Sequence, residues 1–457
     1  MQPESQSQSR LIWNLSWPQM LMMVFHFLIG FVDVWVAGQI DHRVQAALGI
    51  ITQSLFFFLV IATAVAGGGV AAISQSFGAG RHLRAERYIG LCLAIAGAFG
   101  LVFPLVGLPA KGLFVHLLQV PQDIAPLTEH VLTVFLYTLP PYYLLIVLNA
   151  VFRARRQVMV PLYAMILVTA VNTLGDLGFG LGLWGLPRLG VDGIVWATFS
   201  SICLGSAFSL YMLRRAGTLR RQIFAPWRWV KCAFPYLFQV AWPAGLMQVV
   251  WHSGYLVLFA ITASLPENSV NALAGMAAGA RVESLLFLPA FAFNLTASVL
   301  VGNYLGAGKP QEAKRVGLRI LLIGLALVSA LAIVVWQFTG AISSFIAPNP
   351  DVQAEAAGYL YYNILAIPFT LTTMILAGAF GGAGATWYNL VGMGVGTWLV
   401  RLPLAYLLGH VLWKNSTGVW FSMLASQACQ ATILYYIFTR RNWQRFALSK
   451  TRNGTRP

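Results

Sequence analysis

The chain alternates long apolar stretches with short breaks that hold clusters of glycine, proline and charged residues. Apolar runs recur from Leu11 to Thr439, each of about 20 residues or more, which is the length that a helix needs to cross a bilayer. The pattern predicts an all-α polytopic membrane protein. We expect twelve spans, over residues 11–38, 47–77, 88–110, 127–152, 160–184, 190–213, 236–264, 272–304, 316–339, 355–380, 387–412 and 418–439.

The basic residues gather on one side of this predicted topology. Of 29 Lys and Arg residues, 23 fall in the two tails and in alternate breaks, and the opposite side holds only Arg43, Lys111, Arg188 and Lys414. Because cytoplasmic loops collect Lys and Arg, both termini should be cytoplasmic and the protein should lie in the inner (plasma) membrane. The net charge of +16 is then a topology signal, and we expect the lipid bilayer, not nucleic acid, as its partner.

The second half of the chain repeats the first. Trp17-Pro18 recurs as Trp242-Pro243, and Gly78-Ala-Gly80 recurs as Gly306-Ala-Gly308, at offsets of 225 and 228 residues. Each repeat holds six predicted spans, so both copies enter the membrane from the same side. We therefore expect two pseudo-symmetric parallel six-helix lobes around a central cavity, within a monomer.

The repeat sets the expected domain boundaries. They are an N-lobe over 1–213, a cytoplasmic basic linker over 214–235, a C-lobe over 236–440 and a basic cytoplasmic tail over 441–457. In the linker, residues 220–231 interleave basic and aromatic side chains. This segment is expected to lie at the lipid interface, or to reflect only the topology signal and an aromatic belt.

Three acidic residues fall inside the predicted spans: Asp33, Asp176 and Glu283. A charge at the bilayer centre costs roughly 2.5 to 3.5 kcal/mol, so such residues are functional candidates. Asp33 and Asp176 should lie about 8 and about 12 Å below the outer ends of their helices, at 1.5 Å per residue. Asn172 is one turn before Asp176 on the same face. This arrangement predicts a proton or cation site, and the alternatives are a salt-bridged Asp33 and simple interhelical hydrogen bonding by Asn172 and Asp176.

Several other features have more than one interpretation. His26 lies two turns from Asp33, and Pro18 removes a backbone hydrogen bond at which the first span could bend. Glu283 and Arg281 are two residues apart and cannot face each other, so either could line a C-lobe cavity or join an ion pair. Arg401 is expected to make a helix-packing contact.

The remaining motifs argue against other classes of protein. The runs Gly67–Gly69 and 378–384 lack the Lys-Ser/Thr of a phosphate loop, so close helix packing is expected there. The four cysteines have no metal-like spacing, and no Ser/His/Asp set or HExxH motif is present. We expect neither a metal nor an organic cofactor, and no enzyme.

Phe31-Val-Asp-Val-Trp-Val-Ala-Gly38, followed by Ala46-Ala-Leu-Gly49, resembles the first-helix signature of the multidrug and toxic compound extrusion (MATE) transporters. The duplicated Gly-Ala-Gly turns, Pro18 with Pro243, and the Asn172-x-x-x-Asp176 motif match as well. The resemblance covers essentially the whole chain. It implies an exporter of cationic or amphipathic compounds, with Asp33, Asn172 and Asp176 as the coupling site and Pro18 as the bend of the first helix.

The same resemblance places Asn149 and Thr198 near the substrate lining, and we include His26 and Glu283 as lining candidates. The sodium-coupled branch carries carboxylates in spans 7 and 10, where this chain has Tyr255 and Thr370. H⁺ is therefore the expected coupling ion, as in the DinF-like branch, with Na⁺ as the alternative.

The leading hypothesis is a secondary active multidrug antiporter that exchanges inward H⁺ for its substrate through the two aspartates. A flippase for an amphipathic metabolite of the same superfamily is the alternative. Asp33 corresponds to Leu258 or Phe259 in the second repeat, so the coupling chemistry is expected in one lobe only.

Overall fold

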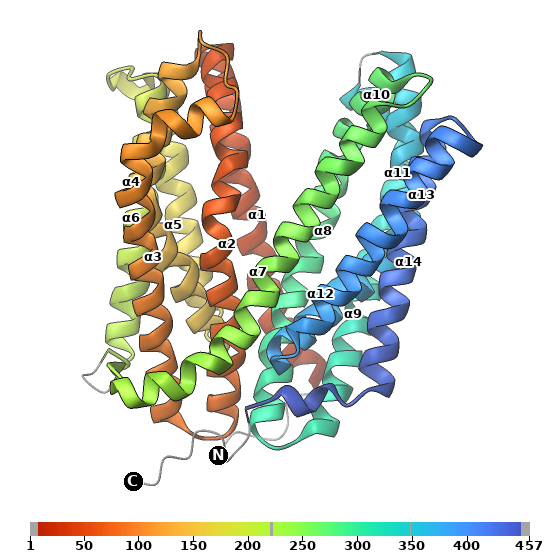
Figure 1. Ribbon diagram of the computed structural model, residues 1–457. Helices are drawn as coiled ribbons and strands as arrows, with labels where there is room; N and C mark the ends of the chain where they lie inside the picture. Colours follow the sequence, from red (N-terminus) through yellow and green to blue (C-terminus); the bar gives the residue numbers. More distant parts are fainter. Residues whose placement is uncertain (1–7, 220–222, 348, 449–457) are drawn as a thin grey trace. The chain divides into compact units, whose positions relative to one another are not determined.

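A computed structural model describes residues 8–219, 223–347 and 349–448, and in these ranges the protein is helical with no strand (Figure 1). The helices of the first half are α1 Gln8–Ile40, α2 His42–Gly78, α3 His82–Leu117, α4 Ala125–Ala154, α5 Met159–Gly175, η1 Asp176–Gly180, η2 Leu183–Gly185 and α6 Val191–Arg215. Those of the second half are α7 Trp227–Ala263, α8 Ser269–Gly306, α9 Pro310–Gln337, α10 Thr339–Ile346, α11 Pro350–Ala383, α12 Thr386–Gly394, η4 Val395–Arg401, α13 Leu402–Tyr406, η5 Leu407–Leu412, α14 Ser416–Arg440 and η6 Trp443–Phe446.

The predicted all-α membrane fold is confirmed. Eleven helices in the described residues are long and apolar enough to cross a bilayer, counting Met159–Gly180 and Thr386–Leu412 as one span each. The twelfth expected span, residues 418–439, corresponds to α14. This helix is 25 residues long, but it interrupts its apolar sequence with polar residues that include buried Ser422, Ser426 and Gln430.

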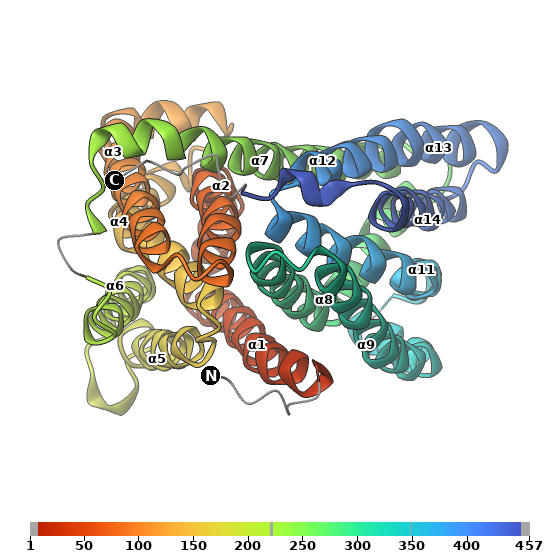
Figure 2. The ribbon, with the colours of Figure 1, turned by 90° about the horizontal axis from the view of Figure 1, so that it is seen from below.

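The chain forms two compact units. The first, here called the N-unit, is Trp17–Phe238, and the second, the C-unit, holds the described part of Met1–Ser16 and of Gln239–Arg452. In this division the start of α1 groups with the second half, and the described residues of the expected linker group with the first. Figure 2 shows the helices of both units from below.

The start of α7 differs from the predicted one. The seventh span was expected from residue 236, whereas α7 begins at Trp227, directly after Pro226, and runs for 37 residues. At 1.5 Å per residue this is about 55 Å, well beyond the roughly 30 Å of a hydrocarbon core. The aromatic and basic residues Trp227–Lys231 of the expected linker therefore form the first turn of a long helix, while residues 220–222 lie outside the described ranges.

Each unit contains the start of the other half's first helix. In the C-unit, Arg319 Nη1 donates to Gln8 Oε1 at 2.7 Å, and the hydroxyls of Ser16 and Thr296 lie 3.0 Å apart. In the N-unit, Trp229 of α7 packs on Tyr88 with ring centroids 5.0 Å apart. The helices α1 and α7, which the repeat makes equivalent, thus both begin in one unit and continue into the other.

The helices inside each unit pack closely against one another. In the N-unit, Leu145, Ala164, Val168 and Ile202 form a buried cluster between α4, α5 and α6. In the C-unit, α8 and α11 meet at Gly378 and Gly382, where an added Cβ would lie 2.1 Å from the carbonyl oxygen of Asn294 and 1.9 Å from that of Ser298. The glycine run is therefore a packing surface, as expected.

Candidate functional site

Three polar side chains from α1, α5 and η1 lie together inside the N-unit. Asn172 Nδ2 donates to Asp176 Oδ1 at 3.5 Å, which the spacing of four residues on one helical face makes possible. The carboxyl group of Asp33, on α1, faces both of these side chains at hydrogen-bonding reach. Asn172 and Asp176 have no exposed surface, and Asp33 is half-buried.

The helix α6 provides a further partner. Asn172 Nδ2 also donates to Thr198 Oγ1 at 3.3 Å, and the Thr198 hydroxyl in turn donates to the carbonyl oxygen of Ile194 at 3.1 Å. Thr198 therefore holds the amide of Asn172 in place from the neighbouring helix.

The substitution Thr198→Val removes this hydrogen bond and should lower the free energy of unfolding by about 1 kcal/mol, the usual net contribution of one hydrogen bond. A drop of a few degrees in thermal unfolding temperature with the helical signal unchanged would be the expected measurement.

The site has spare hydrogen-bonding capacity. Among the described residues, Asp33 Oδ1, Asp176 Oδ2 and Asn172 Oδ1 are buried with no hydrogen-bond partner. Two adjacent carboxylates at this depth repel each other strongly if both are charged, so they are stable together when they share a proton or hold a cation. The three oxygens are hard ligands of the type that a proton or an alkali cation would use.

Asp176 stands where the α-helix changes to a π-helix. Leu181 N donates to the carbonyl oxygen of Asp176 at 3.2 Å, a bond that spans five residues. The segment Asp176–Gly180 has two buried glycines, Gly178 and Gly180, and α6 packs directly against it at Gly193, whose added Cβ would lie 2.4 Å from Gly180 N. Such π segments are often found at functional sites. The sequence does not predict this π segment, and its only local signal is the pair of glycines after Asp176.

Other groups near the site include one that the sequence did not place there. Tyr142 of α4 lies close to the carboxyl group of Asp33. Tyr143, its neighbour, donates instead to the carbonyl oxygen of Phe58. The acidic pair is thus enclosed by α1, α4, α5 and α6.

The remaining predicted residues lie elsewhere. His26 is on an exposed part of α1, and Asn149 is buried in α4 with an Oδ1 that has no hydrogen-bond partner in the described structure. Pro18 is buried, and α1 continues through it as a helix. Glu283 belongs to the C-unit, apart from the three N-unit residues. No group of three or more His, Cys, Asp or Glu residues that could hold a metal ion occurs in the described ranges.

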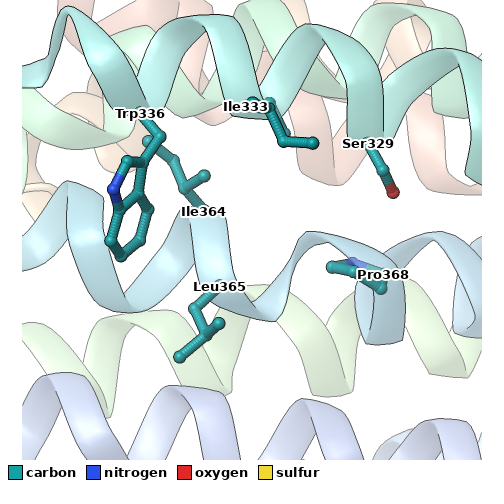
Figure 3. A pocket seen from close by; sticks show the side chains of 7 residues that line it. Ser329, Ile333, Trp336, Ile364, Leu365 and Pro368 are labelled. Carbon is teal, nitrogen blue, oxygen red and sulfur yellow. The ribbon is translucent and has the colours of Figure 1, made fainter.

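A hollow in the C-unit has a different character. It has a volume of about 370 Å³ and lies between α9 and α11, lined by Ser329, Ala332, Ile333, Trp336, Ile364, Leu365 and Pro368 (Figure 3). Trp336, Ile333 and Leu365 are exposed. Its lining includes no charged group, so the hollow cannot supply coupling chemistry.

A helical membrane protein with an internal repeat and a buried acidic pair has the build of a secondary transporter. The MatE family model matches residues 18–177 and 243–407, which are more than half of the chain and one segment in each repeat. The chain therefore belongs to the MatE family, that of the multidrug and toxic compound extrusion transporters, and is a transporter rather than an enzyme. The model of the lipid II flippase MurJ also matches, over residues 121–265.

Relatives align over nearly the full length. The chain is 23% identical over 444 residues to the "Probable multidrug resistance protein NorM" of Thermotoga maritima, covering 95% of this chain and 93% of that protein. It is 26% identical over 453 residues to the multidrug resistance protein PmpM of Pseudomonas aeruginosa, covering 95% and 91%. A solved outward-facing multidrug resistance MATE transporter has the same fold, with a TM-score of 0.88, 18% identity and coverage of 97% and 98%.

Proposed function

We propose that the protein is a proton-driven antiporter that exports cationic or amphipathic compounds across the inner membrane, with both termini in the cytoplasm. The observation that carries this proposal is the pair formed by half-buried Asp33 and fully buried Asp176, whose carboxyl groups are neighbours with one buried, unpartnered oxygen each. Relatives described as multidrug resistance proteins support an exporter of organic compounds. One chain carries both repeats, so a monomer suffices.

The acidic pair couples the two fluxes through its charge. With a proton shared between Asp33 and Asp176, the site carries a single negative charge, and a second proton neutralises it. Loss of protons leaves negative charge in a poorly solvated place, which attracts a cationic substrate or favours a different packing of α1. Asn172 can donate to a carboxylate and stays neutral, so it stabilises the deprotonated state through Asp176.

Sodium is the second candidate for the coupling ion. The unpartnered oxygens of Asp33, Asp176 and Asn172 favour this candidate, because carboxylate and amide oxygens bind hard cations. A bound Na⁺ would need further oxygen ligands, whereas a proton needs only the pair itself. Coupling to Na⁺ therefore requires sodium in the medium, whereas coupling to H⁺ requires only a pH gradient.

The test uses proteoliposomes loaded with a cationic dye under an imposed pH gradient. We expect exchange to continue at its full rate when all sodium is replaced by choline, and to stop when the pH gradient is collapsed by an ionophore. Exchange that is lost in choline and restored by a sodium gradient alone would instead establish sodium coupling.

The partial match to the MurJ model favours a lipid-linked substrate as another candidate. Flippases of this kind would need positive charge facing a phosphate headgroup, whereas the polar site of the N-unit is acidic. Reconstituted protein should therefore leave the leaflet distribution of a fluorescent anionic lipid unchanged while it transports the cationic dye.

A further inference from the structure

The C-unit holds a buried carboxyl group that the proposed function does not use. Glu283 lies in the middle of α8, is 6% exposed, and has Tyr359 of α11 as its hydrogen-bond partner. Tyr359 Oη donates to Glu283 Oε2 at 2.5 Å, a short contact for a hydroxyl and a carboxyl oxygen. A lone carboxylate at this depth is costly, so it must be protonated or compensated.

The contact between Glu283 and Tyr359 is built into the packing. One turn before Glu283, Gly279 leaves room for the tyrosine ring, because an added Cβ would lie 2.4 Å from Tyr359 Cδ1. Trp420 of α14 packs edge-on against the same ring, with centroids 5.1 Å apart. The hydroxyl of Tyr255, from α7, is a second hydrogen-bonding neighbour of Tyr359. Three helices thus hold one phenol against one carboxyl group.

The positive charge that acts on Glu283 is held by another partner. Arg401 is 2% exposed, and its Nε donates to Ser426 Oγ at 2.8 Å. It is near enough to Glu283 to interact with it by charge, but no ion pair within 4.0 Å joins the two residues among those described. Arg401 therefore makes a charged Glu283 tolerable without locking it in a salt bridge.

The repeat relates this cluster to the acidic pair of the N-unit. Arg401 lies 225 residues after Asp176, the same offset that separates Gly193 from Gly418, and both residues belong to π segments. The two units therefore place opposite charges at equivalent positions. In the N-unit, the neighbour of Asp176 is a second acid, Asp33. In the C-unit, the neighbour of Arg401 is also an acid, Glu283, so that a positive and a negative group lie near each other.

Few other ionisable groups face Glu283. Tyr359, Tyr255 and Arg401 are the groups that act on it from α11, α7 and η4. The charged residues of α9 lie within its first ten residues, α11 has only Asp351 and Glu355 near its start, and α14 has none before Arg440. On α8 itself, Arg281 is exposed, and its spacing of two residues puts it on a different face of the helix from Glu283.

We propose that Glu283 is a second exchangeable proton site, located in the C-unit and independent of the acidic pair. When Glu283 is protonated, the buried charge of Arg401 is not compensated. When Glu283 releases this proton, its carboxylate compensates the charge of Arg401 again, beside Tyr255 and Tyr359. The C-unit thereby gains two charge states of its own. This goes beyond the proposed function, which places coupling in the N-unit alone.

The test follows protonated carboxyl groups by infrared difference spectroscopy between acidic and alkaline pH, on substrate-free protein in lipid nanodiscs. The background is the double variant Asp33→Asn and Asp176→Asn, in which Glu283 is the only acid left in the middle of a span. We expect one carbonyl band of a buried protonated carboxyl in this background. Adding Glu283→Gln should remove it, and adding Glu355→Gln, a half-buried glutamate at the start of α11, should not.

A second variant keeps the test decisive if Glu283→Gln fails to fold. Tyr359→Phe keeps the ring in the space left by Gly279 but removes the hydrogen bond, so the carbonyl band should shift in frequency without being lost. No pH-dependent carbonyl band in the background, or a band unmoved by both substitutions, would overturn the proposal. Because no transport is measured, this outcome is separate from failure of the proposed antiport.

Discussion

Asp33→Asn and Asp176→Asn proteoliposomes are each expected to lose dye exchange driven by a pH gradient, down to the level of protein-free liposomes. Asn has the shape of Asp but cannot take up or release a proton, so the pair is left with one acid and no repulsion to drive a change. The same loss of repulsion predicts that both variants unfold at the wild-type temperature or above it. Both substitutions should therefore abolish dye exchange without lowering the unfolding temperature.

The control for this prediction is another aspartate of the N-unit. Asp192 Oδ1 lies 2.5 Å from His130 Nε2 at the start of α6, and both side chains are about half exposed, at 47% and 49%. Even a fully charged exposed pair contributes only about 0 to 1 kcal/mol, so Asp192→Asn should retain exchange. If Asp33→Asn and Asp176→Asn both exchange the dye as the wild type does, these carboxyl groups are not the coupling site.

Gly378→Ala and Gly382→Ala are expected to prevent recovery of a folded, monodisperse protein, or to lower its unfolding temperature sharply. The added methyl groups would lie 2.1 and 1.9 Å from backbone carbonyl oxygens of α8, which cannot move aside as a side chain can. Overpacking costs about 1 to 3 kcal/mol even where side chains yield, and two helix backbones would have to separate here. Size-exclusion profiles and thermal unfolding in detergent measure the effect.

The matched control is one residue away on the same helix. At Gly381 the nearest atom to an added Cβ is Ser298 Oγ at 3.7 Å, an ordinary contact, so Gly381→Ala should be tolerated. It should even help slightly, because alanine favours the helix over glycine by about 1 kcal/mol. Equal damage from Gly381→Ala and Gly382→Ala would show that helix propensity or flexibility, and not the close approach of α8, matters at this position.

The sequence predicts the membrane-spanning helices well because they depend on simple features of the chain. Apolar length defines a span, and the four-residue spacing puts Asn172 and Asp176 on one face. The rotation of α1 that turns Asp33 toward them cannot be derived this way, since it depends on the packing of all the neighbouring helices. The depth estimate placed the two acids at similar heights, and only the structure gives their contact.

The C-unit cluster shows the same limit more strongly. Glu283 and Arg401 are 118 residues apart, and no motif links them. From the sequence, Glu283 could line a cavity or join an ion pair, and Arg401 was expected only to make a helix-packing contact. Their neighbourhood arises from Gly279, which admits Tyr359, and from the π segment that carries Arg401. The close helix crossing that a glycine permits cannot be recognised reliably from sequence. The same holds for the π-helical hydrogen bond between residues five apart.

The helices α1 and α7 begin in one unit and continue into the other, and this bears on how such a chain arose. In each unit, one helix start comes from the other repeat, so a single half of the chain could not form a complete unit by itself. Two identical copies could supply this helix start to each other by exchanging their first turns, as swapped dimers do. This single chain has the same arrangement as such an exchanged dimer, but its two copies differ, with an acid at residue 176 in one and an arginine at residue 401 in the other.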